Sequence, residues 1–257
     1  MALSEWCRDY KDGSREEEVR ILEGEGVTKR FGGLAAVEQM DFHVDQGEVV
    51  GLIGPNGAGK TTLFNLISGV LVPKPGRIEF KSENITGLKP NQICRKGVAR
   101  TFQSVKVFSN MPVFGNIYLA ALFGNRNNLT SAEAAQEATD LLEFVGLSAV
   151  RSSSAQDLTL ANQKRLEVGR ALATKPELLL LDEVMAGLNE TEVAQTMELV
   201  NKIREEGITI VMIEHIMRAI MNVCDRIIVL HHGKKIAEGS PEEIATNETV
   251  VQVYLGE

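Results

Sequence analysis

An octapeptide near the start of the chain has the residue types and the spacing of a phosphate-binding loop. It follows the pattern G-x-x-x-x-G-K-T, in which lysine and threonine come directly after the last glycine. Glycine lets backbone N–H groups turn inward without a Cβ clash, and these groups bind phosphate oxygens together with the N-terminus of a following helix. We therefore predict that a nucleotide is bound by Gly54, Pro55, Asn56, Gly57, Ala58, Gly59, Lys60, Thr61 and Thr62. Lys60 is expected on the β and γ phosphates and Thr61 on Mg²⁺.

Two adjacent carboxylates follow a run of four leucines. The run Leu178–Leu181 is typical of a strand that is buried on both faces, and Asp182 and Glu183 come directly after it. In open α/β sheets, ligands bind at the carboxyl ends of the strands. We expect Asp182 to hold Mg²⁺, directly or through water, and Glu183 to act as the general base that polarises the attacking water. A pair of acids in this position is by itself more often a solvated strand end, but the phosphate-binding loop upstream favours the catalytic interpretation.

The segments around these motifs alternate between strand and helix patterns. We predict strands at Ile21–Gly26, Met40–Val44, Glu48–Ile53, Gly97–Gln103, Leu178–Leu181 and Ile208–Ile213. Helices are predicted at Thr61–Ser68, Gln163–Thr174 and Glu190–Glu206, and a hairpin around Gly233 is predicted from Arg226–Leu230 and Lys235–Glu238. Thr130 and Glu133 form a candidate capping box. The fold class is therefore α/β, with a P-loop NTPase core around a mostly parallel sheet, an N-terminal antiparallel β part and an inserted helical subdomain at about 104–157.

Composition and charge restrict the classes of partner. The chain has 257 residues, 44% hydrophobic and 24% charged, which is ordinary for a folded soluble protein. Its formal net charge of −8 argues against a nucleic-acid partner, because phosphate contacts need clustered lysine and arginine. The sequence has neither a secretory signal nor an apolar run of the roughly 18 residues that cross a bilayer. Any membrane attachment is therefore expected to come from a partner subunit.

In their order and spacing, these motifs resemble those of the ATPase subunits of ATP-binding-cassette (ABC) transporters. The resemblance covers residues 21–257 as one ABC ATPase domain and leaves residues 1–20 as a polar N-terminal tail. It implies ATP hydrolysis coupled to solute transport. It also implies that Gln103, in the family's glutamine loop, contacts Mg²⁺ and the attacking water, and that His215 bonds the γ-phosphate as the switch histidine. Phe31 matches the aromatic residue that stacks on adenine, although a core position was an equal alternative for this side chain.

One motif departs from the family pattern. The family's signature Leu-Ser-Gly-Gly-Gln contacts the γ-phosphate held by the opposite subunit, and the matching residues here are Leu158, Thr159, Leu160, Ala161 and Asn162. Two of these add a Cβ where the family has glycine. Asn189 likewise replaces the usual acid of the dimer-contact loop, and Val184 replaces a common proline.

Three strings resemble the branched-chain amino acid group of this family, namely Arg30–Val37, Ala99–Gln103 and Leu181–Leu188. The resemblance implies a second ATPase subunit in a homodimer or heterodimer, two transmembrane permease subunits and, indirectly, a solute-binding protein. It places the chain at the cytoplasmic face of the inner or cell membrane as a peripheral subunit. The alternatives are an importer of urea or short amides, an exporter of lipopolysaccharide or lipid, and a non-transport cassette ATPase. The acidic charge, the single cassette and the absence of a heptad run disfavour the last of these.

Overall fold

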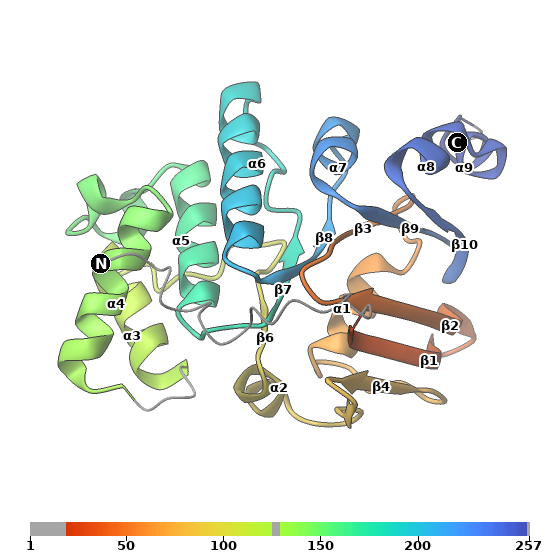
Figure 1. The fold of residues 1–257 in the computed structure, drawn as a ribbon, viewed down its shortest axis with the longest axis horizontal. Helices are drawn as coiled ribbons and strands as arrows, with labels where there is room; N and C mark the ends of the chain where they lie inside the picture. Colours follow the sequence, from red (N-terminus) through yellow and green to blue (C-terminus); the bar gives the residue numbers. More distant parts are fainter. Residues whose placement is uncertain (1–18, 125–128, 256–257) are drawn as a thin grey trace, which may run out of the picture.

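Two sheets share the β-structure of the chain, of which the computed structural model describes residues 19–124 and 129–255 (Figure 1). The larger sheet has the order β10-β9-β3-β8-β7-β6, and its strands are β3 Val49–Ile53, β6 Val98–Arg100, β7 Leu178–Asp182, β8 Thr209–Ile213, β9 Arg226–His231 and β10 Lys234–Gly239. All its pairings are parallel except that of β10 with β9. The smaller sheet is antiparallel, has the order β2-β1-β4-β5, and contains β1 Arg20–Phe31, β2 Leu34–Asp45, β4 Arg77–Phe80 and β5 Glu83–Asn84. The predicted α/β fold class is confirmed.

Helices cover both faces of the larger sheet. Their bounds are α1 Lys60–Ile67, α2 Pro90–Lys96, α3 Val113–Gly124, α4 Ser131–Phe144, α5 Leu160–Leu172, α6 Glu190–Glu205, α7 Met217–Val223, α8 Pro241–Thr246 and α9 Glu248–Leu255. Short 3-10 turns lie at Ser148–Val150 and Ala155–Asp157. Helices α6 and α7 lie on one side of the larger sheet, whereas α1 and the smaller sheet lie on the other (Figure 1). None of the helices within the described ranges combines the length and the apolar character needed to cross a membrane.

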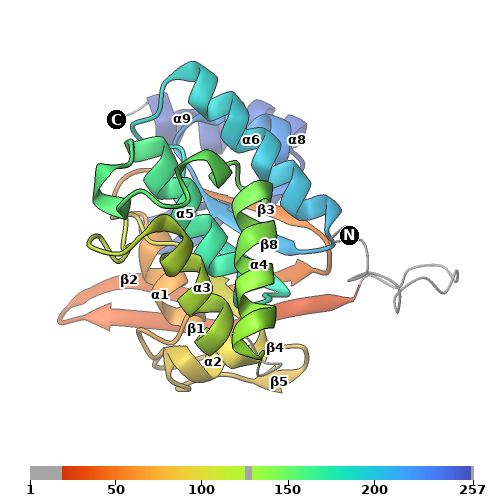
Figure 2. The same ribbon diagram turned by 90° about the vertical axis from the view of Figure 1, so that its left-hand side faces the viewer.

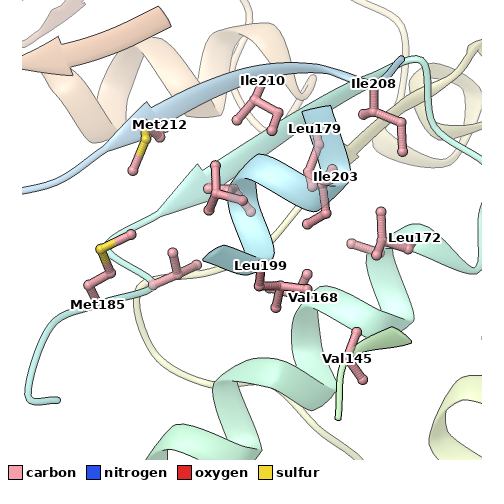
Figure 3. Packing of buried hydrophobic residues seen from close by; sticks show 14 of the residues in the cluster. Val145, Val168, Leu172, Leu179, Met185, Leu199, Ile203, Ile208, Ile210 and Met212 are labelled. Carbon is pink, nitrogen blue, oxygen red and sulfur yellow. The ribbon is translucent and has the colours of Figure 1, made fainter. Parts of the chain in front are cut away.

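The leucine run of β7 is explained by two hydrophobic cores, one on each face of the larger sheet. Leu179 and Leu181 belong to the core shared with α3 to α7, and Leu178 and Leu180 belong to the core between the two sheets. Figure 3 shows the first core. The sheet contributes Leu179, Ile210 and Met212, α5 contributes Val168 and Leu172, and α6 contributes Leu199 and Ile203. Because both faces are buried, the strand has no polar alternation, as the sequence predicts.

Helices α3, α4 and α5 lie side by side at one end of the molecule (Figure 2). They fall within or just after the stretch 104–157, whose boundaries as a subdomain stay a prediction. The capping box is confirmed, since the Thr130 hydroxyl accepts a hydrogen bond from Glu133 N and Thr130 N donates to the Glu133 carboxylate at 2.7 Å. Of the predicted N-terminal tail, residues 1–18 lie outside the described residues, and β1 begins at Arg20.

Several predicted bounds were wrong. Strand β1 continues beyond Gly26 to Phe31 and β2 begins at Leu34, because the two strands stay paired as far as Phe31 and Leu34 at the tip of the hairpin. The predicted strand to Gln103 ends at Arg100. Helix α5 begins at Leu160 and not at Gln163, because Thr159 caps its N-terminus. Elements β4, β5, α7, α8 and α9 lie where no element was predicted, whereas the β9–β10 hairpin is confirmed.

Candidate active site

The glycine-rich loop wraps around the ammonium group of Lys60. Lys60 Nζ donates hydrogen bonds to the carbonyl oxygens of Gly54, at 2.5 Å, and of Pro55, at 2.9 Å. Gly54 has φ +146°, and a Cβ there would lie 2.1 Å from the carbonyl oxygen of Leu230 on β9. Gly59 has φ +108°, and a Cβ there would lie 2.2 Å from the carbonyl oxygen of a β2 residue. Both positions therefore require glycine, since any side chain would collide with neighbouring backbone.

The mouth of this loop presents donors to solvent. Asn56, Gly57 and Thr61 are exposed, whereas Lys60 is buried. No side chain caps the N-terminus of α1, so its first N–H groups are available to an anion. Burial lowers the pKa of Lys60, and the nearby charges of Glu183 and, to a smaller extent, Asp182 oppose that shift. The loop thus offers a desolvated cation and a helix N-terminus to phosphate groups.

Asp182 lies at the end of β7 and is held by Arg100, which the sequence analysis did not identify as a site residue. Arg100 Nη2 lies 2.7 Å from Asp182 Oδ2, and its other amino group bonds Asn65 and Ser68 of the α1 region. The hydroxyl of Thr101 accepts a hydrogen bond from Asp182 N at 3.0 Å. Burial raises the pKa of Asp182, and the hydrogen bond from Arg100 counteracts this. Asp182 Oδ1 is buried and, among the described residues, has no hydrogen-bond partner, which fits a carboxylate oxygen facing a cation or its water shell.

The three predicted catalytic residues converge, although they are far apart in the sequence. Gln103 Nε2 donates to Glu183 Oε2 at 3.0 Å, and His215 Nε2 lies 3.1 Å from Glu183 Oε1. Glu183 itself has φ +52°, a left-handed conformation that is strained for a residue with a side chain. In this conformation its carboxylate contacts both of the other side chains.

Phe31 lies at the tip of the β1–β2 hairpin and is 51% exposed. It pairs with Leu34 across the tip, and the carbonyl oxygen of Ala36, two residues further on, approaches Gly59 of the phosphate-binding loop. The ring is therefore exposed at the surface and available for stacking, and it is not a core residue.

The signature-like residues occupy a different place. They form the N-terminus of α5, where the Thr159 hydroxyl accepts from Asn162 N at 3.4 Å. Within the described part of the chain, no hydrogen bond or ion pair joins Leu158–Asn162 to the phosphate-binding loop. Asn189 caps α6, since its side-chain oxygen accepts from Glu192 N at 3.0 Å. The acid that the family usually has at that position is thus replaced by another good N-cap residue.

Two further buried charges near Glu183 were missed by sequence analysis. Lys164, on α5, donates to the carbonyl oxygens of Glu183 and Ala186, and Glu214, at the end of β8, accepts from Met185 N at 2.7 Å. The only signal for Glu214 was its position directly after a buried strand. Lys164 lies on a helix among other charged residues, so nothing in its sequence context separates it from a surface lysine.

Comparison with known proteins agrees with this geometry. Residues 37–186 match the family model described as ABC transporter, and residues 234–257 match that of the branched-chain amino acid ATP-binding cassette transporter. The chain is 41% identical to BraF, the high-affinity branched-chain amino acid transport ATP-binding protein of Pseudomonas aeruginosa, over 92% of this chain and 98% of that protein. It is 40% identical to the corresponding LivG protein of Escherichia coli with the same coverage.

A solved structure has the same fold. The ADP conformation of MJ1267, an ATP-binding cassette of an ABC transporter, superimposes with a TM-score of 0.84 and is 32% identical, covering 93% of this chain and 99% of that one. The matched family model spans more than half of the chain, and the sequence relatives match it almost end to end. The chain therefore belongs to the ABC transporter family, as an ATP-binding ATPase subunit that carries the C-terminal segment of the branched-chain amino acid cassettes.

Proposed function

We propose that this ATPase powers the import of branched-chain amino acids. The observation that carries the proposal is the match of residues 234–257 to the branched-chain amino acid cassette model, together with the identity of 40–41% to BraF and LivG. A general cassette resemblance would support transport without a substrate class. The C-terminal match lies outside the nucleotide-binding motifs, so it supports the narrower assignment.

The site residues support a division of roles in hydrolysis. The loop from Gly54 to Thr62 and the ammonium of Lys60 bind the phosphates, and Phe31 stacks on adenine. Thr61, Asp182 and Gln103 hold Mg²⁺, whose charge would neutralise the β and γ phosphate oxygens. The unpartnered Asp182 Oδ1 supports this assignment.

Glu183 is the general base for the attacking water. Its two carboxylate oxygens are fixed by Gln103 and His215, and each oxygen keeps a second lone pair that can accept a proton from water. His215 is within reach of the same reacting centre and bonds the γ-phosphate. The carboxylate is thus oriented before the substrate arrives, which lowers the cost of reaching the reactive geometry.

The remaining proposals concern assembly. We assign to the complex a second ATPase subunit, two transmembrane permease subunits and, indirectly, a solute-binding protein, with this chain peripheral at the cytoplasmic face of the membrane. A nucleic-acid partner is not proposed, given the net charge of −8.

Reconstitution tests the function. The chain is purified with its co-purifying membrane subunits, placed in proteoliposomes with the solute-binding protein, and assayed for uptake of labelled leucine. We expect uptake that requires ATP and is lost when Lys60→Ala replaces the wild-type chain. Uptake of urea in place of leucine, or membrane subunits that extract lipid, would refute the substrate assignment while leaving the ATPase assignment intact.

A further inference from the structure

Helix α5 is hydrogen-bonded to the turn that carries Glu183. Lys164 Nζ donates to the carbonyl oxygens of Glu183, at 2.8 Å, and of Ala186, at 2.6 Å. The Glu183 oxygen also accepts Ala186 N at 3.2 Å, so the ammonium reinforces a turn that the backbone already closes. Glu214, which follows β8, accepts a hydrogen bond from Met185 N at Oε1. The backbone of residues 183–186 is therefore held by side chains from two different elements.

The same helix is hydrogen-bonded to the segment that carries Gln103. Glu167, one turn after Lys164, accepts hydrogen bonds at Oε1 from the N–H groups of Phe102, at 3.3 Å, and Lys106, at 3.2 Å. Arg170, one turn further, donates to the Lys106 carbonyl oxygen. Positions i, i+3 and i+6 lie along one face of a helix, so a single face of α5 contacts both catalytic segments.

These contacts are made by buried charges. Lys164 is 7% exposed and Glu167 is 6% exposed. Burying a charge is costly unless hydrogen bonds and opposite charges compensate for lost water, and here burial lowers the pKa of Lys164 and raises that of Glu167. Lys164 and Glu167 are therefore not solvated surface charges, because each forms hydrogen bonds with the backbone of a segment that carries a proposed catalytic residue.

The turn at Glu183 needs such support. A left-handed conformation at a residue with a side chain persists only where the surroundings determine it. The hydrogen bond of 3.0 Å between Gln103 and Glu183 likewise requires that two separate segments keep a fixed distance. Helix α5 is the element that contacts both, and it begins with the signature-like residues.

We propose that Lys164 and Glu167 are positioning residues for ATP hydrolysis, which set the Glu183 carboxylate against the Gln103 amide and tie both to the signature helix of the same subunit. The inference rests on the proposed role of Glu183 as general base. It means that a shift of α5, such as contact with a partner subunit at its N-terminus would cause, is transmitted to the chain's own catalytic pair.

Substitutions in the full-length chain test the roles. Lys164→Met and Glu167→Ala remove the hydrogen bonds, whereas Lys164→Arg and Glu167→Gln retain a donor and an acceptor. Lys202→Met is the matched control, because Lys202 lies on exposed α6 surface and its side chain forms an ion pair with Glu198 of the same helix. The measurements are kcat and KM for ATP, the Kd of a fluorescent ATP analogue, and Tm.

We expect kcat to fall about a hundredfold in Lys164→Met and Glu167→Ala, the size of effect that a small misplacement of catalytic groups produces. The Kd of the analogue should stay within about twofold of wild type, and the conservative variants should recover most of kcat. An unchanged kcat at either position would overturn its role. The role would also be overturned if kcat fell together with Tm or with nucleotide affinity and the conservative variant did not restore it.

A double-mutant cycle separates this inference from the proposed function. If Lys164 acts through Glu183, adding Lys164→Met to Glu183→Gln should cause no further loss of the residual activity. Independent, additive losses would overturn the inference. A Glu183→Gln variant with normal turnover would instead refute the base assignment, whereas an inactive Glu183→Gln beside a fully active Lys164→Met would refute only the positioning role.

Discussion

Lys60 is a buried cation whose hydrogen-bond partners are carbonyl oxygens of its own loop. Phosphate oxygens are better partners for an ammonium group, since charge-assisted hydrogen bonds to anions are the stronger kind. We expect Lys60→Ala to weaken ATP binding by about 10- to 100-fold and to abolish useful hydrolysis. A titration with a fluorescent ATP analogue measures the first effect, with Lys202→Ala as the control. Wild-type affinity and turnover in Lys60→Ala would contradict the phosphate role.

Glu183 is expected to affect turnover and not binding. Glu183→Gln keeps the shape of the side chain and one acceptor oxygen but cannot accept the proton of water. We expect turnover to fall by about 10² to 10⁴, with ATP retained on the protein. Labelled ATP trapped after gel filtration measures the retained nucleotide. Glu190→Gln, on the exposed first turn of α6, should behave as wild type, and normal hydrolysis by Glu183→Gln would exclude Glu183 as the base.

The proposed catalytic residues lie close together, and this proximity could be predicted because they lie at the ends of strands. Asp182, Glu183 and His215 come at or just after buried apolar runs, and the carboxyl ends of parallel strands meet at one edge of a sheet. The roles of Arg100 and Lys164 could not be predicted in the same way. Both are defined by contacts with residues about 20 to 80 positions away, such as Asp182 at 2.7 Å from Arg100, and those contacts exist only once the sheet is assembled.

At the scale of elements, the predictions of helices and strands were correct where a local sequence signal marked the element. The continuous apolar runs of β7 and β8 and the cap of α4 are local signals, and the structure places these elements as predicted. The outer halves of β1 and β2 mix buried residues such as Val27 and Val37 with exposed ones such as Arg30 and Leu34, so no regular alternation marks them. The first turn of α5 was missed because leucine and alanine were interpreted as replacements in a glycine motif, although both favour helix.

The end of β8 should make folding stability depend on pH. Burial raises the pKa of Glu214 from 4.5 to about 7, and the negative charge of Glu183 adds to the rise. The hydrogen bond from Met185 N, the charge of Lys164 and the hydrogen bond from His215 N oppose it. The folded chain therefore binds this proton more tightly than the unfolded chain does. The resulting stabilisation is complete below about pH 4.5 and is lost as the pH rises through about 7, an effect on the order of 3 kcal/mol.

Glu214→Gln removes this titration and keeps an acceptor for Met185 N. We expect the free energy of unfolding of wild type, relative to that of Glu214→Gln, to fall between pH 5 and pH 8. Denaturant titrations at the two pH values measure the difference, and any constant offset from the amide cancels in the comparison. A difference between wild type and Glu214→Gln that is the same at both pH values would contradict a raised pKa.

At the scale of the whole molecule, the groups proposed to bind and hydrolyse ATP lie where the parts of the fold meet. Elements of the larger sheet supply Glu183 and His215, the loop before α1 supplies Lys60, and the hairpin of the smaller sheet supplies Phe31 (Figure 1). Gln103 lies on the segment between the sheet and the helices α3 and α4. A relative movement of these parts would therefore change the distances within the site itself.

The signature-like residues lie at the N-terminus of α5, apart from this site. The family resemblance places two ATP molecules between two head-to-tail subunits, so that each ATP meets the P-loop of one chain and the signature of the other. Of the two residues that replace glycine, Ala161 is only 6% exposed, so its methyl group is directed into the chain's own interior. Leu160 is 44% exposed and is the side chain that a partner-bound phosphate would meet.

We therefore expect a heterodimer with unequal sites. The ATP on this chain's P-loop would meet an ordinary signature on the partner and would turn over faster, whereas the partner's ATP would meet Leu160, whose side chain hinders close approach of the phosphate to the backbone. The base-to-amide change is made separately in each ATPase of the reconstituted complex. Glu183→Gln should reduce transport much more than the equivalent change in the partner, and Leu160→Gly should make the two losses more alike. Equal losses in the wild-type background, or full activity of this chain as a homodimer, would contradict the asymmetry, because an exposed leucine would then not impede the phosphate that the opposite subunit holds.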